Sequence, residues 1–274
     1  MKGGRGGEEA QKEAEKVGLR VLSLGAGVQS STLLLMACEG EEHLDAAIFA
    51  DTGWEPAAVY QHLDWLEGKA RAATIPLYRV GSASLRADAL ANKTMSWMPL
   101  YDDARSQLKR QCTRNYKIRP IRRQVRALGG GPNRPVQQLV GISLDEWHRM
   151  RDSDVGYITN VYPLVDRRMT RHDCLNWLAR HGYPTPPRSH CVGCPFRTNR
   201  EWRDLTPAEW EDAVDFDARI RSVRSRTERR EVFLHRSAVP LPLVDLSTEQ
   251  ERGQLDMFEQ SDGCGVLCPS EGAA

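Results

Sequence analysis

The sequence lacks the features that mark a membrane or exported protein. None of its apolar runs reaches the roughly 20 residues that a membrane-spanning helix needs. The N-terminal stretch MKGGRGGEEAQKEAEK has no apolar signal-peptide core, and we expect a disordered or frayed lead over residues 1–19. These absences predict a cytoplasmic protein without a membrane partner. The formal net charge of the 274 residues is only +1, so overall charge indicates no particular partner.

The chain also lacks the common phosphate-binding motifs. The Walker Lys is missing, and Gly25 and Gly27 do not extend to G-x-G-x-x-G, because residue 30 is Ser. What is present is an apolar strand at 20–24, which ends in a loop of Gly, Ser and Gln and opens into a leucine-rich helix. Such a loop exposes backbone N–H groups at the positive end of a helix, so it predicts a phosphate-bearing ligand.

Strands and helices alternate along the chain, which predicts an α/β fold with a doubly wound, mostly parallel sheet. The second strand ends in Asp51-Thr52-Gly53, and we expect this end to line the same crevice as the loop. Capping boxes are expected at Thr170 and Thr206. The expected strands are 20–24, 46–50, 75–80, 137–142 and 158–163, and the expected helices are 56–70, 84–92, 114–128, 170–181 and 206–221.

The seven cysteines form the second signal, because in a reducing compartment they indicate metal, cluster or catalytic use more than disulfides. Cys191 and Cys194 form a C-x-x-C motif, which clips a metal or cluster or forms a redox pair. Cys112 lies in the basic segment Lys109–Arg126, whose cations favour its thiolate form. Core packing is the expected role of the two cysteines in amphipathic helices, which are Cys38 and Cys174.

The loop resembles that of the PP-loop superfamily of adenine-nucleotide enzymes, which includes ATP pyrophosphatases and sulfonucleotide (PAPS and APS) reductases. Gly25–Ser30 occupies the frame of the pyrophosphatase motif S-G-G-x-D-S, with Gln29 in place of the Asp, as in the PAPS-reductase variant. Asp51–Trp54 is similar to the D-T-G-Y of that family, and Gly141–Glu146 to its Gly-Leu-Arg-Arg-Glu-like loop. Because the Asp is missing, the loop gives weaker support for magnesium-assisted cleavage of ATP. The prediction that it binds an adenine nucleotide is not affected.

The resemblance implies the adenine nucleotide alpha hydrolase-like fold, with ATP or an adenylylated sulfate as the ligand, with or without Mg. The residues expected to bind this nucleotide are Ser23, Gly25, Gly27, Gln29, Ser30, Ser31, Asp51, Thr52, Gly53, Gly141, Arg149 and Arg151.

A further resemblance concerns metal. Cluster-containing APS reductases carry a Cys-Cys pair and a distant C-x-x-C around one [4Fe-4S] centre, and Gln111-Cys112 stands where that pair would. A tail cysteine as fourth ligand, or an open iron as in cluster-dependent tRNA-thiolating PP-loop enzymes, would complete the site. Zinc, with His190 or a tail cysteine, is the alternative. The implied ligands are Cys112, Cys191, Cys194 and Cys268.

The tail offers a third comparison. Sulfonucleotide reductases end in a mobile E-C-G-x-H segment whose Cys attacks sulfur, and the nearest match here is Gly263–Cys268. Cys264 and Cys268 are therefore candidate catalytic thiols. The Glu and His are missing, which argues against a thiosulfonate mechanism, and an oxidisable pair without a catalytic role is the alternative.

The basic segment Lys109–Arg126 contains no acidic residue. It is expected to contact the phosphates of a nucleotide, or of a tRNA or DNA acceptor. Lys117 is a catalytic candidate, because it lies close in sequence to the expected cluster ligand Cys112. A solvated helix face is the alternative interpretation.

These features predict a nucleotide-binding domain at 20–185 and an irregular, cysteine-containing C-terminal extension at 186–274 that packs on it. Two enzyme functions compete. In one, ATP drives Fe–S-assisted sulfur transfer from a thiol or sulfide donor to a nucleic-acid or small-molecule acceptor. In the other, a thiol reduces APS or PAPS. Gln29 favours the reductase, whereas the missing tail context, the single Cys112 and the basic segment favour sulfur transfer, which we adopt. A non-catalytic nucleotide and redox sensor is the third hypothesis.

Overall fold

The computed structural model describes residues 18–81, 83–93, 96–228 and 231–247. None of the helices within these residues is long and apolar enough to cross a membrane. Two expected catalytic residues, Cys264 and Cys268, lie outside the described residues, as does the lead up to residue 17.

The contacts of the chain divide it into two compact units, each assembled from three segments of sequence. The chain enters unit 2 for the last time at Pro187. Unit 1 comprises the described residues up to Phe49 with Leu63–Val80 and Ile121–Pro186. Unit 2 comprises Ala50–His62, Gly81–Pro120 and the described residues from Pro187.

A five-stranded parallel sheet forms the centre of unit 1. Its strands are β1 (Leu19–Leu24), β2 (Ala46–Ala50), β3 (Leu77–Val80), β5 (Val136–Val140) and β6 (Ile158–Val161). Their order across the sheet is β3-β2-β1-β5-β6, and β1 pairs in parallel with both β2 and β5. β1 and β2 are almost entirely buried, as parallel strands are when both faces of the sheet are covered.

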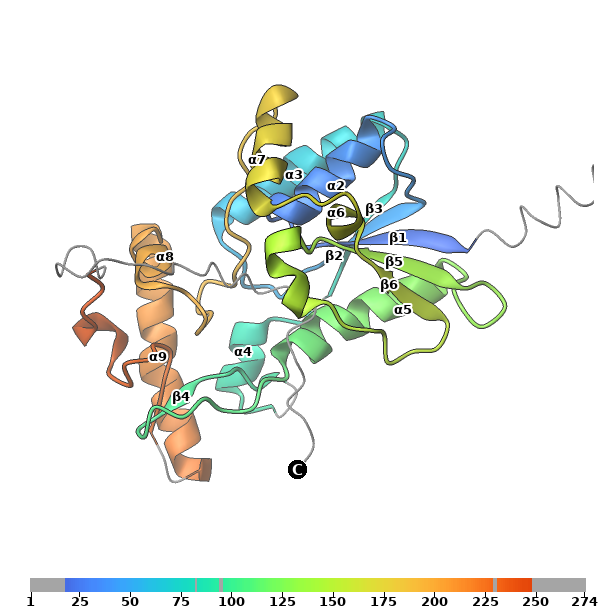
Figure 1. The fold of residues 1–274 in the computed structure, drawn as a ribbon. Coiled ribbons are helices and arrows are strands. Elements are labelled where there is room, and N and C mark those ends of the chain that lie inside the picture. The colour runs from blue at the N-terminus through green and yellow to red at the C-terminus, as the bar shows by residue number, and fades with distance from the viewer. Residues whose placement is uncertain (1–17, 82, 94–95, 229–230, 248–274) are drawn as a thin grey trace, which may run out of the picture. The chain divides into compact units, whose positions relative to one another are not determined.

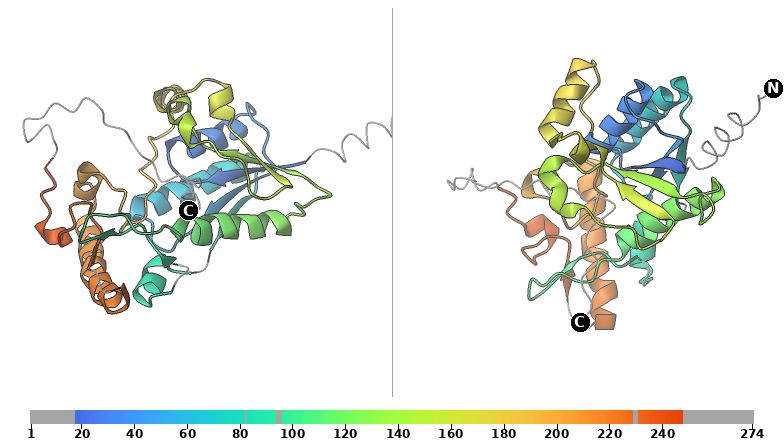
Figure 2. Two further views of the ribbon diagram at one scale, coloured as in Figure 1. Left: turned by 60° about the horizontal axis from the view of Figure 1, so that its bottom comes forward. Right: turned by 45° about the vertical axis from the view of Figure 1, so that its right-hand side comes forward.

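Helices cover both faces of this sheet. They are α2 (Val28–Cys38), α3 (Ala57–Ala72), α5 (Arg119–Ala127), the 3₁₀ helix η3 (Leu144–Arg149), α6 (Pro163–Asp166) and α7 (Arg171–Arg180). α2 packs against α7 on one face, and α5 lies on the other face (Figures 1 and 2). The α/β, doubly wound fold predicted from the sequence is therefore confirmed.

The strand order reverses between β1 and β5, because the chain first runs outward through β2 and β3 and then continues on the other side. In doubly wound sheets, ligands bind at the carboxyl ends of the strands at this switch point. The two loops that leave the strands there begin at Gly25 and at Gly141. The topology thus brings two segments that the sequence singled out to one edge of the sheet.

Unit 2 is mostly helical around an aromatic core. Its elements are α4 (Leu85–Leu90), β4 (Tyr101–Asp102), the π-helix η2 (Thr113–Ile118), α8 (Asn199–Arg203), α9 (Pro207–Glu228), β7 (Val232–Phe233) and the 3₁₀ helix η4 (Leu241–Leu243). Trp54, Trp202 and Phe216 are buried together, and the rings of Trp54 and Phe216 are 4.5 Å apart. The fully buried carboxylate of Asp217 on α9 accepts hydrogen bonds from the backbone N–H groups of Leu234 and Leu241, so it ties the chain after β7 to α9.

The expected capping boxes are present. Thr170 and Asp173 cap α7 reciprocally, and Thr206 and Glu209 exchange bonds of 3.3 and 3.0 Å before α9. α9 continues to Glu228, beyond the expected end at 221.

Four segments differ from expectation. The expected helix 114–128 is a π-helix followed without a break by α5, and Pro120 is the second residue of α5. Two stretches for which no helix or strand was expected contain short elements, which are η3 before residue 153 and β4 within residues 96–106. The expected strand at 158–163 ends at Val161, because Pro163 starts α6.

Candidate functional site

The loop between β1 and α2 has the backbone of an anion-binding turn. Gly27 is the N-cap of α2 and has no side chain to offer the first-turn N–H groups, and no acidic residue lies in that turn. Ala26 adopts a left-handed backbone with φ 56°, which is sparsely populated for residues other than glycine and often marks functional sites. The positive end of α2 is therefore left available for a negative ligand.

Serine side chains line the same loop. The Ser30 hydroxyl accepts a hydrogen bond from the Gly25 N–H at 3.1 Å and donates to the Gly27 carbonyl at 3.4 Å, so it fixes the turn. Ser31 is fully buried in α2. The Ser23 hydroxyl is buried without a hydrogen-bond partner, and such a group has unused capacity for a ligand or a water molecule.

The loop after β5 closes over the start of α2. A Cβ atom at Gly141 would lie 2.7 Å from the Ser30 nitrogen, so a side chain there would push this loop away. Gln29 reaches the same loop, since its Nε2 donates to Ser143 Oγ at 3.3 Å and to Glu146 Oε2 at 3.1 Å. The Glu146 carboxylate is in turn paired with Arg149 at 2.8 Å.

Arg151 differs from Arg149 in its surroundings. Its guanidinium donates to the carbonyls of His148 and Met150 at 2.9 and 2.7 Å, so it closes the end of η3. Both arginines were expected to bind the nucleotide. Arg149 is paired with a side chain next to the α2 loop, whereas Arg151 is bonded to backbone.

The segment Asp51–Gly53 belongs to unit 2. The Asp51 carboxylate accepts hydrogen bonds from the Gly53 N–H at 2.7 Å and from the Tyr60 hydroxyl at 2.9 Å, which fixes a turn at Gly53 with φ +66°. Thr52 faces a cavity described next.

A cavity in unit 2 brings three of the expected metal ligands together. Its lining is largely apolar and includes Leu85, Met98 and Phe196. The polar and reactive side chains that line it are Thr52, Arg110, Cys112, Thr113, Lys117, Cys191 and Cys194. Arg110 lies over the Phe196 ring at 4.9 Å. Thiols and two cations thus meet in a site with apolar walls, although these residues come from distant parts of the sequence.

A buried carboxylate connects the thiol to a cation in this cavity. Glu55 Oε1 accepts hydrogen bonds from Thr52 Oγ1 at 3.0 Å and from the Cys191 thiol at 3.7 Å. The same oxygen lies 3.7 Å from Lys117 Nζ. Thr52 Oγ1 is also 3.3 Å from Cys191 Sγ. A cysteine beside a hydroxyl and a carboxylate, with that carboxylate paired to an ammonium group, is placed for proton transfer to or from sulfur.

The C-x-x-C segment is fixed by backbone contacts. The Val192 N–H donates to the Trp54 carbonyl at 2.8 Å. A Cβ atom at Gly193 would lie 2.1 Å from the Trp54 ring, so only glycine fits. The buried Arg197 donates to the carbonyls of Cys191 and Val192 at 3.2 and 3.0 Å. These contacts hold both cysteines against the cavity.

The metal expectation rests on donor chemistry. Three thiols line one cavity, which suits an iron–sulfur cluster or zinc. Within the described residues, however, no group of three or more His, Cys, Asp or Glu side chains is arranged to hold a metal ion. His190, the alternative zinc ligand, lies 3.7 Å from the Glu201 carboxylate.

The cysteines expected in the core have different surroundings. Cys174 is fully buried in α7, and Cys38 is half-buried at the end of α2. Burial raises the pKa of the Cys38 thiol to about 11 and that of the Cys174 thiol to about 12. Both thiols stay protonated near neutral pH, so they are poor nucleophiles and poor metal ligands.

The basic segment does not form one uniform face. Lys117 is buried beside Glu55, Arg122 pairs with Asp154, and Arg126 donates to the Tyr157 hydroxyl at 3.0 Å. Other cations of the segment are exposed, and these include Arg114, Arg119 and Arg123. The segment thus divides its charges between the thiol cavity and solvent.

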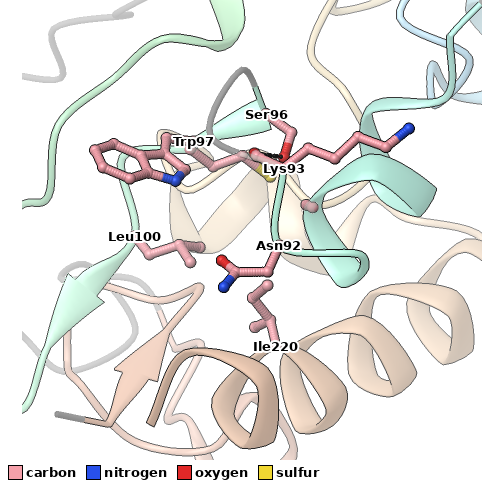
Figure 3. A pocket seen from close by; sticks show the side chains of 8 residues that line it. Asn92, Lys93, Ser96, Trp97, Leu100 and Ile220 are labelled. Atoms are coloured by element: carbon pink, nitrogen blue, oxygen red, sulfur yellow. Dashed lines mark hydrogen bonds between the residues drawn. The ribbon is translucent and has the colours of Figure 1, made fainter. Parts of the chain in front are cut away.

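A second cavity of unit 2, of about 200 Å³, lies among Asn92, Trp97, Leu100 and Ile220 (Figure 3). No cysteine lines it. The ammonium group of Lys93 is directed to Asp88 at 2.6 Å, and together with the Tyr116 hydroxyl it lowers the pKa of that carboxyl. This cavity therefore offers few groups for chemistry.

Sequence reasoning missed Glu55, Glu146 and Arg197. Glu146 stood within the reductase-like loop and followed a strand, which was a usable signal. Glu55 and Arg197 carried no signal, because their partners are determined by tertiary contacts.

Comparison with known proteins gives matching solved structures, and one of them serves as an example. It is a phosphoadenylyl-sulfate (PAPS) reductase from Candida auris, in a phosphate complex, with 15% sequence identity and a TM-score of 0.42. The match covers 65% of this chain and 81% of that chain. No model of a known protein family matches the chain, and no curated protein matches it. A likeness of this size does not bear on activity, so the functional argument rests on the residues themselves.

Proposed function

We propose that the chain is an adenine-nucleotide-dependent enzyme of sulfur chemistry, which activates an acceptor with ATP and transfers sulfur to it. The observation that carries this proposal is the unit 2 cavity, in which three thiols share an apolar-walled site with Lys117 and Arg110. Thiols bind and transfer sulfur, and the two cations favour thiolates and anionic substrates.

Support for a nucleotide in unit 1 comes from the α2 loop. An uncapped helix start, a left-handed Ala26 and the unpartnered Ser23 hydroxyl lie at the switch point of a doubly wound sheet. These features suit the phosphates of ATP or of an adenylylated sulfate. The proposed ligand contacts are the loop residues named from the sequence.

The reaction proceeds in two steps. An oxygen of the acceptor attacks the α-phosphorus of ATP, which forms an acceptor–AMP ester and releases pyrophosphate. Sulfide then attacks the activated carbon, so a carbon–sulfur bond forms, the carbon–oxygen bond breaks and AMP leaves. The role of Glu55 and Lys117 is to hold or move the proton at Cys191 Sγ.

A nucleic acid is the first acceptor to test. Arg114, Arg119 and Arg123 are exposed along the continuous helical segment from η2 into α5. Such cations contact phosphates of tRNA or DNA without reading sequence.

A [4Fe-4S] cluster held by Cys112, Cys191 and Cys194, with a tail cysteine or an open iron, belongs to the same proposal. When bound, it would supply a site for sulfide or for electrons. Zinc is the alternative. A reducing cytoplasm suits this chemistry, and the five described cysteines are not joined in disulfides.

The second candidate is a thiol-dependent reductase of APS or PAPS. The neutral Gln29 favours it, since an adenylylated sulfate arrives already activated and needs no metal-assisted cleavage. A cysteine thiolate would attack the sulfate sulfur and form a thiosulfonate, and it would expel AMP from APS or adenosine 3′,5′-bisphosphate from PAPS. A second thiol would then release sulfite and form a disulfide. A nucleotide and redox sensor without turnover is the third candidate.

One experiment separates the three. Full-length protein is incubated anaerobically with ATP, sulfide and tRNA or DNA, and in parallel with APS or PAPS. We expect AMP release from ATP that depends on the acceptor, and no mass increase on the peptide that contains Cys264. A thiosulfonate adduct on Cys264 with release of sulfite overturns the proposal in favour of the reductase. The absence of any AMP or pyrophosphate release favours the sensor.

A further inference from the structure

We propose that Glu146 is a positioning residue, held by Gln29, which fixes Arg149 beside the α2 loop. In this arrangement Arg149, and not a metal ion bound at residue 29, neutralises the phosphates of the nucleotide. The inference rests on the proposed function of the loop and specifies how unit 1 recognises its ligand.

Three contacts carry this inference. Gln29 is the second residue of α2, and its Nε2 donates to Glu146 Oε2 at 3.1 Å. The other carboxylate oxygen, Oε1, pairs with Arg149 Nη1 at 2.8 Å. Ser143, on the same loop as Glu146, accepts a second bond from Gln29 at 3.3 Å. Both oxygens of Glu146 are thus occupied by protein donors.

Glu146 and Arg149 are largely shielded from water, so their charges affect the binding of an anionic ligand strongly. Glu146 is only 8% exposed, and the side chain of Arg149 is 13% exposed. Burial raises the pKa of the Glu146 carboxyl, and the pairing with Arg149 opposes this rise. A buried carboxylate near a helix N-terminus competes with an anionic ligand for the same positive potential. Arg149 offsets this competition, and its charge is always present because guanidinium does not deprotonate in proteins.

The identity of residue 29 follows from these contacts. A Gln amide donates to Glu146 without adding charge, whereas a carboxylate at residue 29 would stand against a second carboxylate in a buried site. The pyrophosphatase-type loop has an Asp in this place. Here the acidic group comes from η3 instead, and Arg149, not a metal, is its counter-ion.

The test is a charge swap between the two positions. APS and ATP binding to the full-length protein is measured by calorimetry in EDTA and in excess Mg²⁺. For the wild type we expect equal APS affinity in both conditions, within about twofold. Gln29→Glu should weaken APS binding by at least about tenfold, because a charge-assisted bond is worth that much. Adding Glu146→Gln should restore most of the affinity and make ATP binding depend on Mg²⁺.

Control variants separate this role from a general effect on folding. Gln137→Glu makes the same chemical change on β5 at an exposed side chain that already contacts Arg20, and it should leave binding unchanged. Gln29→Met removes the hydrogen-bond donor Nε2 without adding charge. It therefore perturbs folding less than Gln29→Glu does. It should weaken APS binding several-fold without creating Mg²⁺ dependence.

The outcomes distinguish a failure of the proposed function from a failure of the inference about Glu146 and Arg149. Wild-type protein that binds neither APS nor ATP contradicts the proposed function and this inference together. Wild-type protein that binds APS only with Mg²⁺ overturns the inference alone. Wild-type affinity in Gln29→Glu, or a charge swap that restores nothing, also overturns the inference alone.

Discussion

The two units of this chain build their candidate sites in opposite ways. In unit 1, a short continuous stretch around Gly25–Ser31 forms most of the site, and one loop after β5 completes it. In unit 2, the thiol cavity gathers side chains from around Thr52, Cys112 and Cys191. The first site is made of backbone and hydroxyl groups, and the second of thiols and paired charges.

This contrast indicates different tasks. Backbone donors and a helix dipole bind an anion without undergoing chemistry. Thiols beside a carboxylate and an ammonium group exchange protons and bonds. The cysteines repeat the contrast, since those of unit 1 are kept protonated by burial, whereas those of unit 2 line a cavity.

The largest expected effect concerns the thiols. Protein prepared without oxygen should contain about four irons per chain if a [4Fe-4S] cluster is present. Cys112→Ala, Cys191→Ala and Cys194→Ala should each lose the iron, as measured by metal analysis and absorption spectra. Cys174→Ala and Cys38→Ala, in unit 1, should keep it. Stoichiometric zinc without iron would contradict the cluster and indicate a structural zinc site instead.

The next effect concerns the loop of unit 1. Gly27→Val would place a branched side chain at the start of α2, where the phosphate is expected, and should weaken nucleotide binding by at least about tenfold, or ~1.4 kcal/mol. Calorimetry with ATP, APS and PAPS measures this. Gly156→Val is the matched control, since a Cβ atom there meets nothing within 4 Å. Equal binding by the Gly27 variant would show that the loop is not the site.

A smaller effect is expected at Gly193. Gly193→Ala would press a methyl group into the Trp54 ring and should cost about 1–3 kcal/mol of stability, the usual range for overpacking. Hydrogen exchange should report the loss of protection in unit 2 and not in unit 1. Gly156→Ala serves as the control. Loss of protection spread equally over both units would contradict the assignment of this contact to unit 2 alone.

The smallest effect is a difference in pH dependence. Burial lowers the pKa of His62 and of His235 to about 4, from an ordinary value of 6.5. Both histidines belong to unit 2 and are neutral near neutral pH in the folded state. Their contribution to the stability of unit 2 is therefore fully present above pH 6.5 and is lost as the pH falls toward 4. In unit 1, Cys38 and Cys174 have raised pKa values, so their contribution is present below pH 9 and is lost as the pH rises toward 11.

Hydrogen exchange at pH 7, 5 and 9.5, corrected for intrinsic rates, tests this difference. Unit 2 should lose protection first in acid, and His62→Leu should reduce that loss. Unit 1 should lose protection first in alkali. Equal acid sensitivity of the two units would count against the role of the histidines.

The sequence predicted local features better than tertiary ones. The strand–loop–helix at Ser23–Ser31 and the box at Thr170 have all their determinants within a few residues, so pattern and capping rules found them. η2 was missed because a π-helix retains a near-helical pattern of side chains.

The contacts of Glu55 and Cys191 join residues 136 positions apart, so no local pattern encodes them. The motif C-x-x-C nevertheless indicated a reactive site. What it did not indicate is the carboxylate, which reaches the cavity only after Thr52 and Glu55 are brought to Cys191 by folding.

The most direct test of the account follows labelled sulfur. Full-length protein is incubated anaerobically with ATP, radiolabelled sulfide and tRNA or DNA, and AMP and acceptor-bound label are counted together. We expect equimolar AMP and incorporated sulfur in the wild type. In Cys191→Ala we expect loss of incorporation with unchanged nucleotide affinity, because that cysteine belongs to the thiol cavity and not to the loop. Sulfite release from APS with no label in any acceptor would contradict the account.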